Sequence, residues 1–353
     1  MDFINCVLNW VVLPASLVML ACSWPALRFI NTCEWLYKSF YSEDMEDKVV
    51  IITGASSGIG EQIAYEYAKR KVNLVLIARR EHRLRGIREK ARYIGAKQVM
   101  IMAADVVKED DCRRFVNETV SHFGRVDHLV NTASLGHIFY FEEVGDTSVL
   151  KHLLDINFWG NVYPTYVALP YIHQSNGRVV VNAAVESWLP LPRMSLYAAA
   201  KAALVNFYES LRFEVSGEIG ITIATHGWIG SEMGRGKFMQ EDGAEMLWKE
   251  ERELNGTGGP VEDYARRMVS GACRGDEYVK YPSWYDVFLL LYRMFAPGVL
   301  NWTLRMLLAS PGSRRRSLAG TERPLFEGGS SPPRKLLTFS HLDPQKIQMQ
   351  KLE

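Results

Sequence analysis

Tyr197 and Lys201 form a Tyr-x-x-x-Lys pair that could move a proton at a carbon–oxygen group. Side chains four residues apart share one face of a helix, so the ammonium would lie close to the phenol. An unperturbed tyrosine has a pKa of about 10, and a nearby positive charge favours its ionised form. We therefore expect Tyr197 to act as the acid or base and Lys201 to lower its pKa. Such a pair suits hydride transfer at a carbinol carbon, because that reaction also needs a proton to move on the oxygen.

The elements that must position this pair form an alternating pattern of apolar strands and helices. Stretches of helical length, such as residues 108–123 and 146–169, separate the apolar segments. Continuous apolar strands that alternate with helices predict a parallel sheet covered on both faces. We therefore predict an α/β domain with a doubly wound parallel sheet over residues 46–275. The expected strands lie in KVVII, VNLVLIA, QVMIMAADV, HLVNTAS, GRVVVNAAV and GITIATHGW.

The turn after the first predicted strand is rich in glycine and reads TGASSGIG from Thr53 to Gly60. Glycines in such a turn let the backbone bend tightly and approach a pyrophosphate, which then faces a helix N-terminus. Because the turn joins a predicted strand to a predicted helix, it indicates a Rossmann-type dinucleotide site. The residues expected at the phosphates are Gly54, Ser56, Ser57, Gly58, Ile59 and Gly60.

The end of the second predicted strand indicates which dinucleotide binds. An NAD site is expected to carry an acidic residue there, but the sequence reads Ala78-Arg79-Arg80. A guanidinium can hold a 2′-phosphate through two hydrogen bonds, so Arg79 and Arg80 favour NADP(H) over NAD. The alternative is a solvated basic face, because charged residues continue into the next predicted helix.

These motifs occur in an order that resembles the short-chain dehydrogenase/reductase family. The resemblance covers roughly residues 48–233, and its motifs are TGASSGIG, Asp105-Val106, Asn131-Thr132-Ala133-Ser134, Asn157 and YAAAK. A narrower resemblance is to the plant steroleosins, hydroxysteroid dehydrogenases of seed oil bodies. It rests on a proline-interrupted apolar N-terminus and on the segments LLDINFWGNVYPTYVALPY and WLPLPRMSLYAAAKAALVNFYESLR.

The resemblance implies a role for each matching position. Asn157 would hold a backbone kink and a water molecule of a proton relay, which makes it the third catalytic residue. Lys201 would also hold the ribose hydroxyls of the cofactor, close to Tyr197. His226 replaces the proline that is usual in the family, and we expect it to be buried and hydrogen-bonded. The remaining cofactor contacts implied are Arg79 and Arg80 at the 2′-phosphate, Asp105 and Val106 at the adenine, Thr132, Ala133 and Ser134 at the nicotinamide ribose, and Ile229 at the nicotinamide.

One catalytic group that the family uses is absent. The family places a serine thirteen residues before the tyrosine, and Ala184 occupies that position. The missing hydroxyl would donate to the substrate oxygen, an interaction that can be worth several kcal/mol in a transition state. Asn182 shares the strand face but lies roughly 6–7 Å back along it. Ser187 follows in the next loop, so we interpret Ala184 and Ser187 as the positions that contact substrate.

The alanine leaves three functions open. The first is an NADP(H)-dependent oxidoreductase that interconverts hydroxyl and keto groups of a steroid- or sterol-like lipid, with Tyr197 assisted by water or Ser187. The second is a catalytically weakened protein that binds NADP(H) and a sterol-like ligand. The third is a structural protein of lipid droplets, which the intact tyrosine, lysine, asparagine and phosphate turn disfavour. We favour the first, because losing one donor usually reduces a rate rather than removing a mechanism.

The first forty residues, 1–40, form a hydrophobic segment that differs from the rest of the chain. An uncharged run of 25 residues begins at Phe3, and as a helix it would rise roughly 37 Å, enough to cross a hydrocarbon core. Pro14 and Pro25 favour a kinked span or a hairpin in one leaflet, and a buried leader helix is the alternative. Positive charge appears only from Arg28 onward, so either anchor leaves the catalytic domain facing the cytosol. The expected location is the endoplasmic reticulum membrane, the lipid-droplet monolayer or both.

The end of the chain divides into two further segments. Residues 276–310 contain an apolar stretch that we interpret as an amphipathic helical extension at a membrane interface, over the pocket or in a dimer. Residues 311–353 are rich in proline, glycine, serine and basic residues, and we predict a disordered tail.

Composition narrows the classes of partner. Lys and Arg number 41, and Asp and Glu number 40, so the net charge is +1. The protein as a whole therefore has no strong positive potential that would attract nucleic acid. Five cysteines show neither a disulfide framework nor metal-ligand spacing, so no metal is expected. Apolar residues near the expected site suit a hydrophobic substrate, and the family resemblance implies a homodimer.

Overall fold

The computed structural model describes most of the chain up to residue 282. The described ranges are residues 2–40, 42–56, 58–137, 139–144, 147–189, 191–215, 217–227, 229, 238–239, 259–282, 298–299 and 302. The chain divides into two units, Met1–Phe288 and Leu289–Glu353, and the first contains the whole sheet. The predicted tail at 311–353 lies outside the described residues, as does most of the predicted extension at 276–310.

A seven-stranded parallel sheet forms the centre of the domain, with the order β3-β2-β1-β4-β6-β7-β9. The predicted doubly wound α/β fold is therefore confirmed. The sheet extends past the boundary predicted at residue 275, because β9 pairs with β7. The strands are β1 (Val49–Thr53), β2 (Asn73–Ala78), β3 (Gln98–Ala103), β4 (His128–Asn131), β6 (Arg178–Ala184), β7 (Gly220–His226) and β9 (Tyr278–Tyr281).

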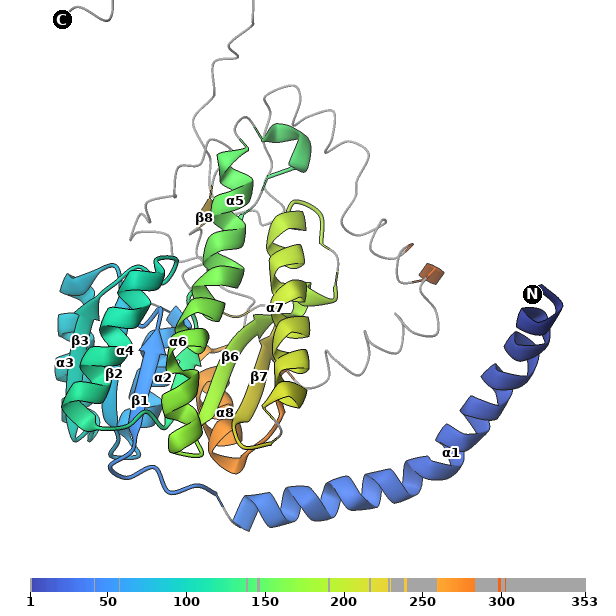
Figure 1. Ribbon diagram of the computed structural model, residues 1–353, viewed down its shortest axis with the longest axis horizontal. Helices are drawn as coiled ribbons and strands as arrows, with labels where there is room; N and C mark the ends of the chain where they lie inside the picture. Colours follow the sequence, from blue (N-terminus) through green and yellow to red (C-terminus); the bar gives the residue numbers. More distant parts are fainter. Residues whose placement is uncertain are drawn as a thin grey trace, which may run out of the picture. The chain divides into compact units, whose positions relative to one another are not determined.

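Helices cover both faces of this sheet, which explains why its strands are continuous apolar runs. Val50 and Ile52 of β1 point into one core, and Val49 and Ile51 point into the other. The first core is closed by α2 (Gly58–Ala68), α3 (Glu81–Ile94) and α8 (Val261–Arg274). The second is closed by α4 (Glu109–Phe123), α6 (Gly160–Gln174) and α7 (Ser195–Glu214), which lie together on one side of the sheet in Figure 1.

Short elements shape the carboxyl edge of the sheet. The predicted helical stretch at 146–169 contains α5 (Ser148–Leu154), a π-helical turn η2 (Asp155–Trp159) and the start of α6. A small two-stranded sheet pairs β5 (Gly136–His137) with β8 (Phe238–Met239). Two 3₁₀ turns complete the set, η1 (Phe141–Glu143) and η3 (Val185–Ser187).

The strand order fixes where a ligand can bind. The chain runs outward from β1 to β3 and then returns to place β4 on the other side of β1. In open parallel sheets, ligands bind at the carboxyl ends of the strands where the order reverses in this way. Thr53 and Asn131, the last residues of β1 and β4, are paired in register at this point.

The N-terminal segment is one long helix, α1 (Asp2–Phe40), with Pro14 and Pro25 inside it. Figure 1 shows that α1 curves along its length, and the prolines do not interrupt it. Large apolar side chains on it are exposed, among them Trp10 and Phe29. Within the described residues, no helix is long and apolar enough to cross a membrane.

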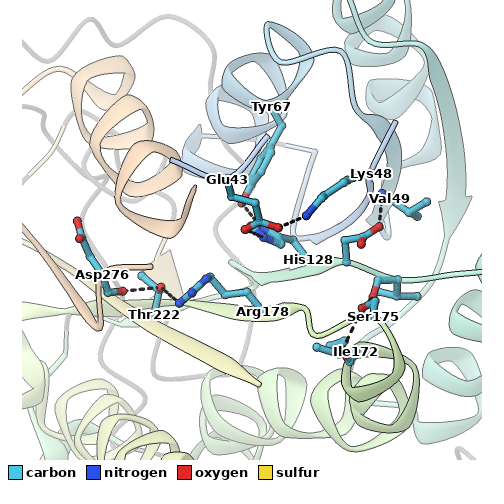
Figure 2. A network of polar contacts seen from close by, with 12 residues as sticks. Glu43, Lys48, Val49, Tyr67, His128, Ile172, Ser175, Arg178, Thr222 and Asp276 are labelled. Atoms are coloured by element: carbon cyan, nitrogen blue, oxygen red, sulfur yellow. Dashed lines mark hydrogen bonds and ion pairs between the residues drawn. The ribbon is translucent and has the colours of Figure 1, made fainter. Parts of the chain in front are cut away.

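The domain begins before residue 46, because the chain after α1 bonds to the amino end of the sheet. Figure 2 shows that Glu43 and Tyr67 meet His128, which is fully buried, and that Lys48 pairs with Glu43. The Tyr67 hydroxyl lies 2.8 Å from His128 Nδ1, and Glu43 Oε2 lies 3.2 Å from Nε2. Burial raises the pKa of Glu43, but His128 and Lys48 outweigh it and hold that pKa at about 2. The Glu43 N–H also donates to the Cys273 carbonyl at 2.8 Å.

Candidate active site

The glycine turn lies at the carboxyl end of β1 and packs against the segment that follows β4. Gly54 has a φ of 66°, in the left-handed region. A Cβ atom added there would lie 2.8 Å from the Ala133 nitrogen, and one added at Gly60 would lie 2.8 Å from Thr132 Oγ1. The added Cβ at Gly60 would lie closer still to the Gly54 carbonyl. The turn therefore has to keep a bare backbone at the N-terminus of α2, which is the form of a pyrophosphate cradle.

The other residues of the predicted phosphate turn lie around this cradle. Ser56 is buried, and Gly58 begins α2 with a φ of 56°. Ile59 is half-buried and packs against the core, whereas Ser57 lies outside the described residues.

Thr132 braces the glycine turn. Its Oγ1 donates to the Thr53 carbonyl at 2.5 Å, and its N–H donates to Thr53 Oγ1 at 3.3 Å. The adjacent Ala133 carbonyl accepts from Asn161 Nδ2 at 3.3 Å. These bonds explain the close approach of the glycines, because they join the ends of β1 and β4.

Arg80 reaches from the end of β2 to the glycine turn. Its NH2 group donates to Ser56 Oγ at 3.1 Å, and its Nε donates to the same oxygen at 3.3 Å. Arg79 is exposed beside it. After β3, Val106 is buried and the Asp105 N–H donates to Asp111 Oδ2 at 2.8 Å. The residues predicted to hold the phosphates and the adenine thus lie at the carboxyl ends of three adjacent strands, β1, β2 and β3.

Asn157 lies in the π-helical turn η2, so the backbone departs from a regular helix where the resemblance implies a kink. Its Nδ2 donates to the carbonyls of Leu135 at 2.7 Å and Leu153 at 2.9 Å. Its Oδ1 accepts from the Leu135 N–H at 3.0 Å and from Ser134 Oγ at 2.9 Å. Asn157 therefore fixes the segment that follows β4 against η2.

Tyr197 and Lys201 lie in the first turns of α7, and both are 1 % exposed. Lys201 Nζ lies 5.7 Å from the centre of the Tyr197 ring and donates to the Asn182 carbonyl at 3.0 Å. Burial lowers the pKa of Lys201 to about 8, and the Glu186 carboxylate acts in the opposite direction. The structure therefore brings the two predicted residues together in a site with little water.

The electrostatics of Tyr197 differ from our expectation. We expected Lys201 to lower the pKa of this phenol, but burial and the negative charge of Glu186 raise it. The Ser134 hydroxyl acts in the opposite direction and lowers it. Desolvation disfavours the phenolate more strongly than the spacing of the pair suggests, because both side chains are buried.

Glu186 is a residue of this site that we did not predict. It lies in η3, which packs against α7, and it is 7 % exposed. Burial raises its pKa to about 7, while its own backbone N–H and Lys201 act to lower it. The available signal was a carboxylate two residues after Ala184, at the carboxyl end of a buried strand.

Ala184 is fully buried at the end of β6, in register with His226 of β7. Ser187 is half-buried in η3, and no hydrogen bond joins it to Tyr197 in the described part of the chain. Asn182 Oδ1 accepts from the Tyr264 hydroxyl at 2.7 Å.

His226, the last residue of β7, and Ile229 are both buried. His226 Nδ1 lies 2.7 Å from the Gly227 carbonyl, and burial lowers the pKa of this histidine to about 4. The expectation of a buried, hydrogen-bonded histidine is confirmed. Ile229 is 5 % exposed and bridges to Gly259.

Asn131 makes side-chain contacts that its motif did not predict. Its Nδ2 lies within hydrogen-bond distance of Thr165 Oγ1 at 2.9 Å, the Tyr208 hydroxyl at 3.1 Å and the Asn161 carbonyl at 3.1 Å. These contacts join β4 to α6 and α7. They fix the strand that leads to Ser134 relative to the helix that carries Tyr197.

A phosphate cradle at the switch point of a parallel sheet, beside a buried tyrosine and lysine, defines a dinucleotide-binding oxidoreductase. Residues 48–242 match the family described as short chain dehydrogenase. The chain belongs to the short-chain dehydrogenase family. The Rossmann fold of this family binds a nicotinamide dinucleotide.

Similarity to relatives extends over nearly the whole chain. It is 69% identical over 348 residues to "11-beta-hydroxysteroid dehydrogenase B" of Sesamum indicum, covering 98% of this chain and 95% of that protein. It is 70% identical over 348 residues to the protein of the same name from Arachis hypogaea, covering 96% and 98%. It is 67% identical over 337 residues to "11-beta-hydroxysteroid dehydrogenase-like 5" of Arabidopsis thaliana, covering 95% and 86%. The chain is thus a hydroxysteroid dehydrogenase-like oxidoreductase.

Solved structures share the fold at much lower sequence identity. An alcohol dehydrogenase from Thermococcus sibiricus, complexed with 5-hydroxy-NADP, matches with a TM-score of 0.55 and 23% identity, covering 67% of this chain and 96% of that chain. A dehydrogenase/reductase from Sinorhizobium meliloti 1021 matches with a TM-score of 0.58 and 24% identity, covering 68% and 96%. Both support the fold alone.

Proposed function

We propose that the chain is an NADP(H)-dependent oxidoreductase that interconverts hydroxyl and keto groups of a steroid- or sterol-like lipid. The observation that carries the proposal is the pair Tyr197 and Lys201, buried on one face of α7 beside Asn157 and the dinucleotide cradle. The names of the relatives support the substrate class.

The residues around the glycine turn fit a dinucleotide phosphate. A side chain at Gly54 or Gly60 would fill the cradle, and the N-terminus of α2 favours negative charge there. When bound, the nicotinamide dinucleotide supplies or accepts the hydride. Arg80 lies beside Ser56 at the edge of this cradle and, with Arg79, would hold a 2′-phosphate, which supports NADP(H) over NAD.

Tyr197 handles the proton at its phenolic oxygen. In reduction the Tyr197 O–H bond breaks and the proton passes to the substrate oxygen, and in oxidation the phenolate takes a proton from the alcohol. Burial and Glu186 keep the phenol protonated in the free protein, so Tyr197 is ready to act as an acid. A protonated phenol is the form that reduction uses, because a ketone needs a proton donor.

A binding protein of weak activity is the second candidate, and Ala184 favours it. The fully buried methyl group offers no hydrogen bond to a substrate oxygen. Such a protein would hold NADP(H) and a sterol-like ligand in the same site and turn over slowly. A structural role on lipid droplets is the third, and the assembled site argues against it as the sole role.

The proposal includes attachment of the protein to a lipid surface. Exposed apolar side chains along α1, including Trp10, Met19 and Phe29, would enter a membrane or a lipid-droplet monolayer. The catalytic domain would face the cytosol from the endoplasmic reticulum, the lipid droplet or both. An apolar substrate could then reach the site from the lipid phase.

The proposal also includes a homodimer. A surface pocket of about 380 Å³ is lined by residues of α6 and α7, and Tyr166 and Phe213 are exposed on these helices. Exposed aromatic side chains on a helix pair suit a second copy of the chain.

Turnover with a panel of steroids and sterols tests the main proposal. We expect NADPH oxidation with a keto substrate or NADP reduction with a hydroxyl substrate, and loss of both in Tyr197→Phe. Cofactor binding, followed by the fluorescence of NADPH, should remain in that variant. Cofactor binding without turnover in the wild type would instead support the binding protein, and equal turnover in Tyr197→Phe would exclude the assigned acid.

A further inference from the structure

His137 carries a buried imidazole whose two nitrogens lack hydrogen-bond partners. It is the second residue of β5 and is 0 % exposed. Among the residues that the structure describes, neither Nδ1 nor Nε2 of His137 meets a donor or an acceptor. The ring packs on Phe139, with the ring centres 4.5 Å apart. A buried polar group without a partner destabilises a folded protein, because it has lost its hydrogen bonds to water.

The surroundings of His137 keep the imidazole neutral. The nearby residues Leu135 and Phe139 belong to an apolar cluster with Val149 and Leu153 of α5. Burial lowers the pKa of His137 to about 4. A neutral imidazole has one N–H that donates and one bare nitrogen that accepts. His137 can therefore donate to a keto group or accept from a hydroxyl group of a ligand.

The two strands of the small sheet follow segments that are expected to line the nicotinamide end of the site. β5 begins two residues after Ser134, and β8 comes after Ile229 in the chain. β5 also packs against α7, the helix that carries Tyr197. His137 therefore lies at the end of the site where the reaction takes place, away from the phosphate cradle.

The pairing of β5 with β8 is a weak barrier to a ligand. Two residue pairs join the strands, Gly136 with Phe238 and His137 with Met239. A ladder this short contributes little stability of its own. A substrate can therefore separate the two strands at small cost and reach the imidazole.

We propose that His137 binds a second oxygen of the substrate, a keto or hydroxyl group remote from the carbon that reacts. The proposal rests on the proposed oxidoreductase function and names a specificity-determining residue for it. Tyr197 meets the reacting oxygen, and His137 lies on a different element, three residues beyond Ser134. The preferred substrate is then a steroid-like lipid with oxygen at both ends, rather than a sterol with a single hydroxyl group.

The substrate preference of the full-length protein tests this contact. The probes are a steroid diketone with a keto group at each end of its ring system and the two monoketones that each lack one of these groups. With NADPH, the KM of the wild type for the diketone should be about tenfold lower than for the monoketone that it reduces, because that monoketone leaves His137 unpaired. The two kcat values should be similar, since the contact is the same in the ground state and the transition state.

Substitution of His137 should remove this preference. In His137→Phe, the KM for the diketone should rise about tenfold, to that of the monoketone, whose own KM should change by less than about twofold. His137→Gln should keep most of the preference, because its amide can donate and accept. His122→Gln is the control and should keep all of it, since His122 is exposed on α4 and bonds to Gln98. A His137→Phe protein that retains the preference, or that binds both steroids equally worse, would overturn the proposal.

A binding measurement separates failure of this contact from failure of the proposed function. In full-length protein labelled with ¹⁵N at histidine, the His137 signals are those missing in both His137→Phe and His137→Gln. Addition of the diketone to the wild type with NADP should shift these signals, and one of the two monoketones should not, because imidazole ¹⁵N shifts report hydrogen bonding. A shift without turnover would establish the contact and remove the proposed function. Turnover without a shift would leave the function and overturn the contact.

Discussion

The Lys201 ammonium donates to the Asn182 carbonyl oxygen at 3.0 Å, and the Asn182 side chain accepts from the Tyr264 hydroxyl at 2.7 Å. Asn182 lies in β6, so this one residue joins α7 on one face of the sheet to α8 on the other. The bond holds a buried ammonium beside Tyr197, where a lysine is otherwise costly.

Gly60→Ala should abolish tight cofactor binding. The new methyl group would lie 2.8 Å from Thr132 Oγ1 and closer still to the Gly54 carbonyl, so the backbone of the cradle has to move. We expect the Kd for NADPH to rise more than tenfold and the free energy of unfolding to fall by about 1–3 kcal/mol. Gly86→Ala on α3 is the matched control, because nothing lies within 4 Å of its added Cβ. Chemical denaturation should show that the control is stabilised by up to about 1 kcal/mol.

Arg80→Leu should reduce the preference for NADP(H) over NAD(H). The guanidinium lies beside Ser56 of the glycine turn, at 3.1 Å, where a 2′-phosphate would meet it. Loss of charge-assisted hydrogen bonds should raise the Kd for NADPH about 10–100-fold and leave that for NADH nearly unchanged. Arg88→Leu is the control. Arg88 lies in α3, the helix that follows Arg80, and it pairs with Glu89, so its loss should change neither Kd. An equal effect of Arg80→Leu on both dinucleotides would contradict a 2′-phosphate contact.

The sheet and the phosphate turn could be predicted because their signals are local. Each strand is a continuous apolar run, and the turn carries its own glycines between a strand and a helix. The seventh strand, β9, was missed because YVKY is short and carries a lysine. Its β-structure comes from pairing with β7 at the edge of the sheet, a contact that local pattern does not contain.

The chemistry within the site depended on contacts distant in sequence. Thr132 braces the glycine turn only because β4 lies beside β1, and strand order is not a local property. The spacing of Tyr197 and Lys201 predicted that they are neighbours, but not that burial would control both pKa values. Glu186 is buried because η3 folds back onto α7. The bond of Ser134 to Asn157 depends on the packing of η2, which the position of Ser134 in its motif does not contain.

Glu186→Gln should stabilise the protein at neutral and alkaline pH. Burial raises the pKa of Glu186 from 4.5 to about 7, so the folded protein binds more protons than the unfolded chain between these values. The contribution of Glu186 to the free energy of unfolding is therefore most favourable below pH 4.5 and becomes less favourable as the pH rises to about 7. Glutamine does not ionise, so the free energy of unfolding of the variant should exceed that of the wild type by roughly 2–3 kcal/mol at pH 8 and differ little near pH 4.5. Urea denaturation at the two pH values measures the gain.

An exposed acid provides the control for that measurement. Glu262 lies on the surface of α8, and Glu262→Gln should alter stability little at either pH. A gain in Glu186→Gln that is the same at both pH values would show that the benefit comes from packing and not from the buried charge.

Ala184→Ser should raise the rate of turnover. The side chain at 184 is fully buried at the end of β6, thirteen residues before Tyr197, and a hydroxyl there would donate to the oxygen of the substrate. Such a donor stabilises developing charge in the transition state, so we expect kcat to increase at least tenfold with KM little changed. Ala183→Ser is the matched control, because its side chain points to the other face of the strand and should give no increase. Ala184→Ser combined with Tyr197→Phe should remain inactive, since the new hydroxyl needs the phenol to supply the proton. An unchanged kcat in a folded Ala184→Ser protein would mean that the oxygen of the substrate already has its donor, and that the alanine does not limit the reaction.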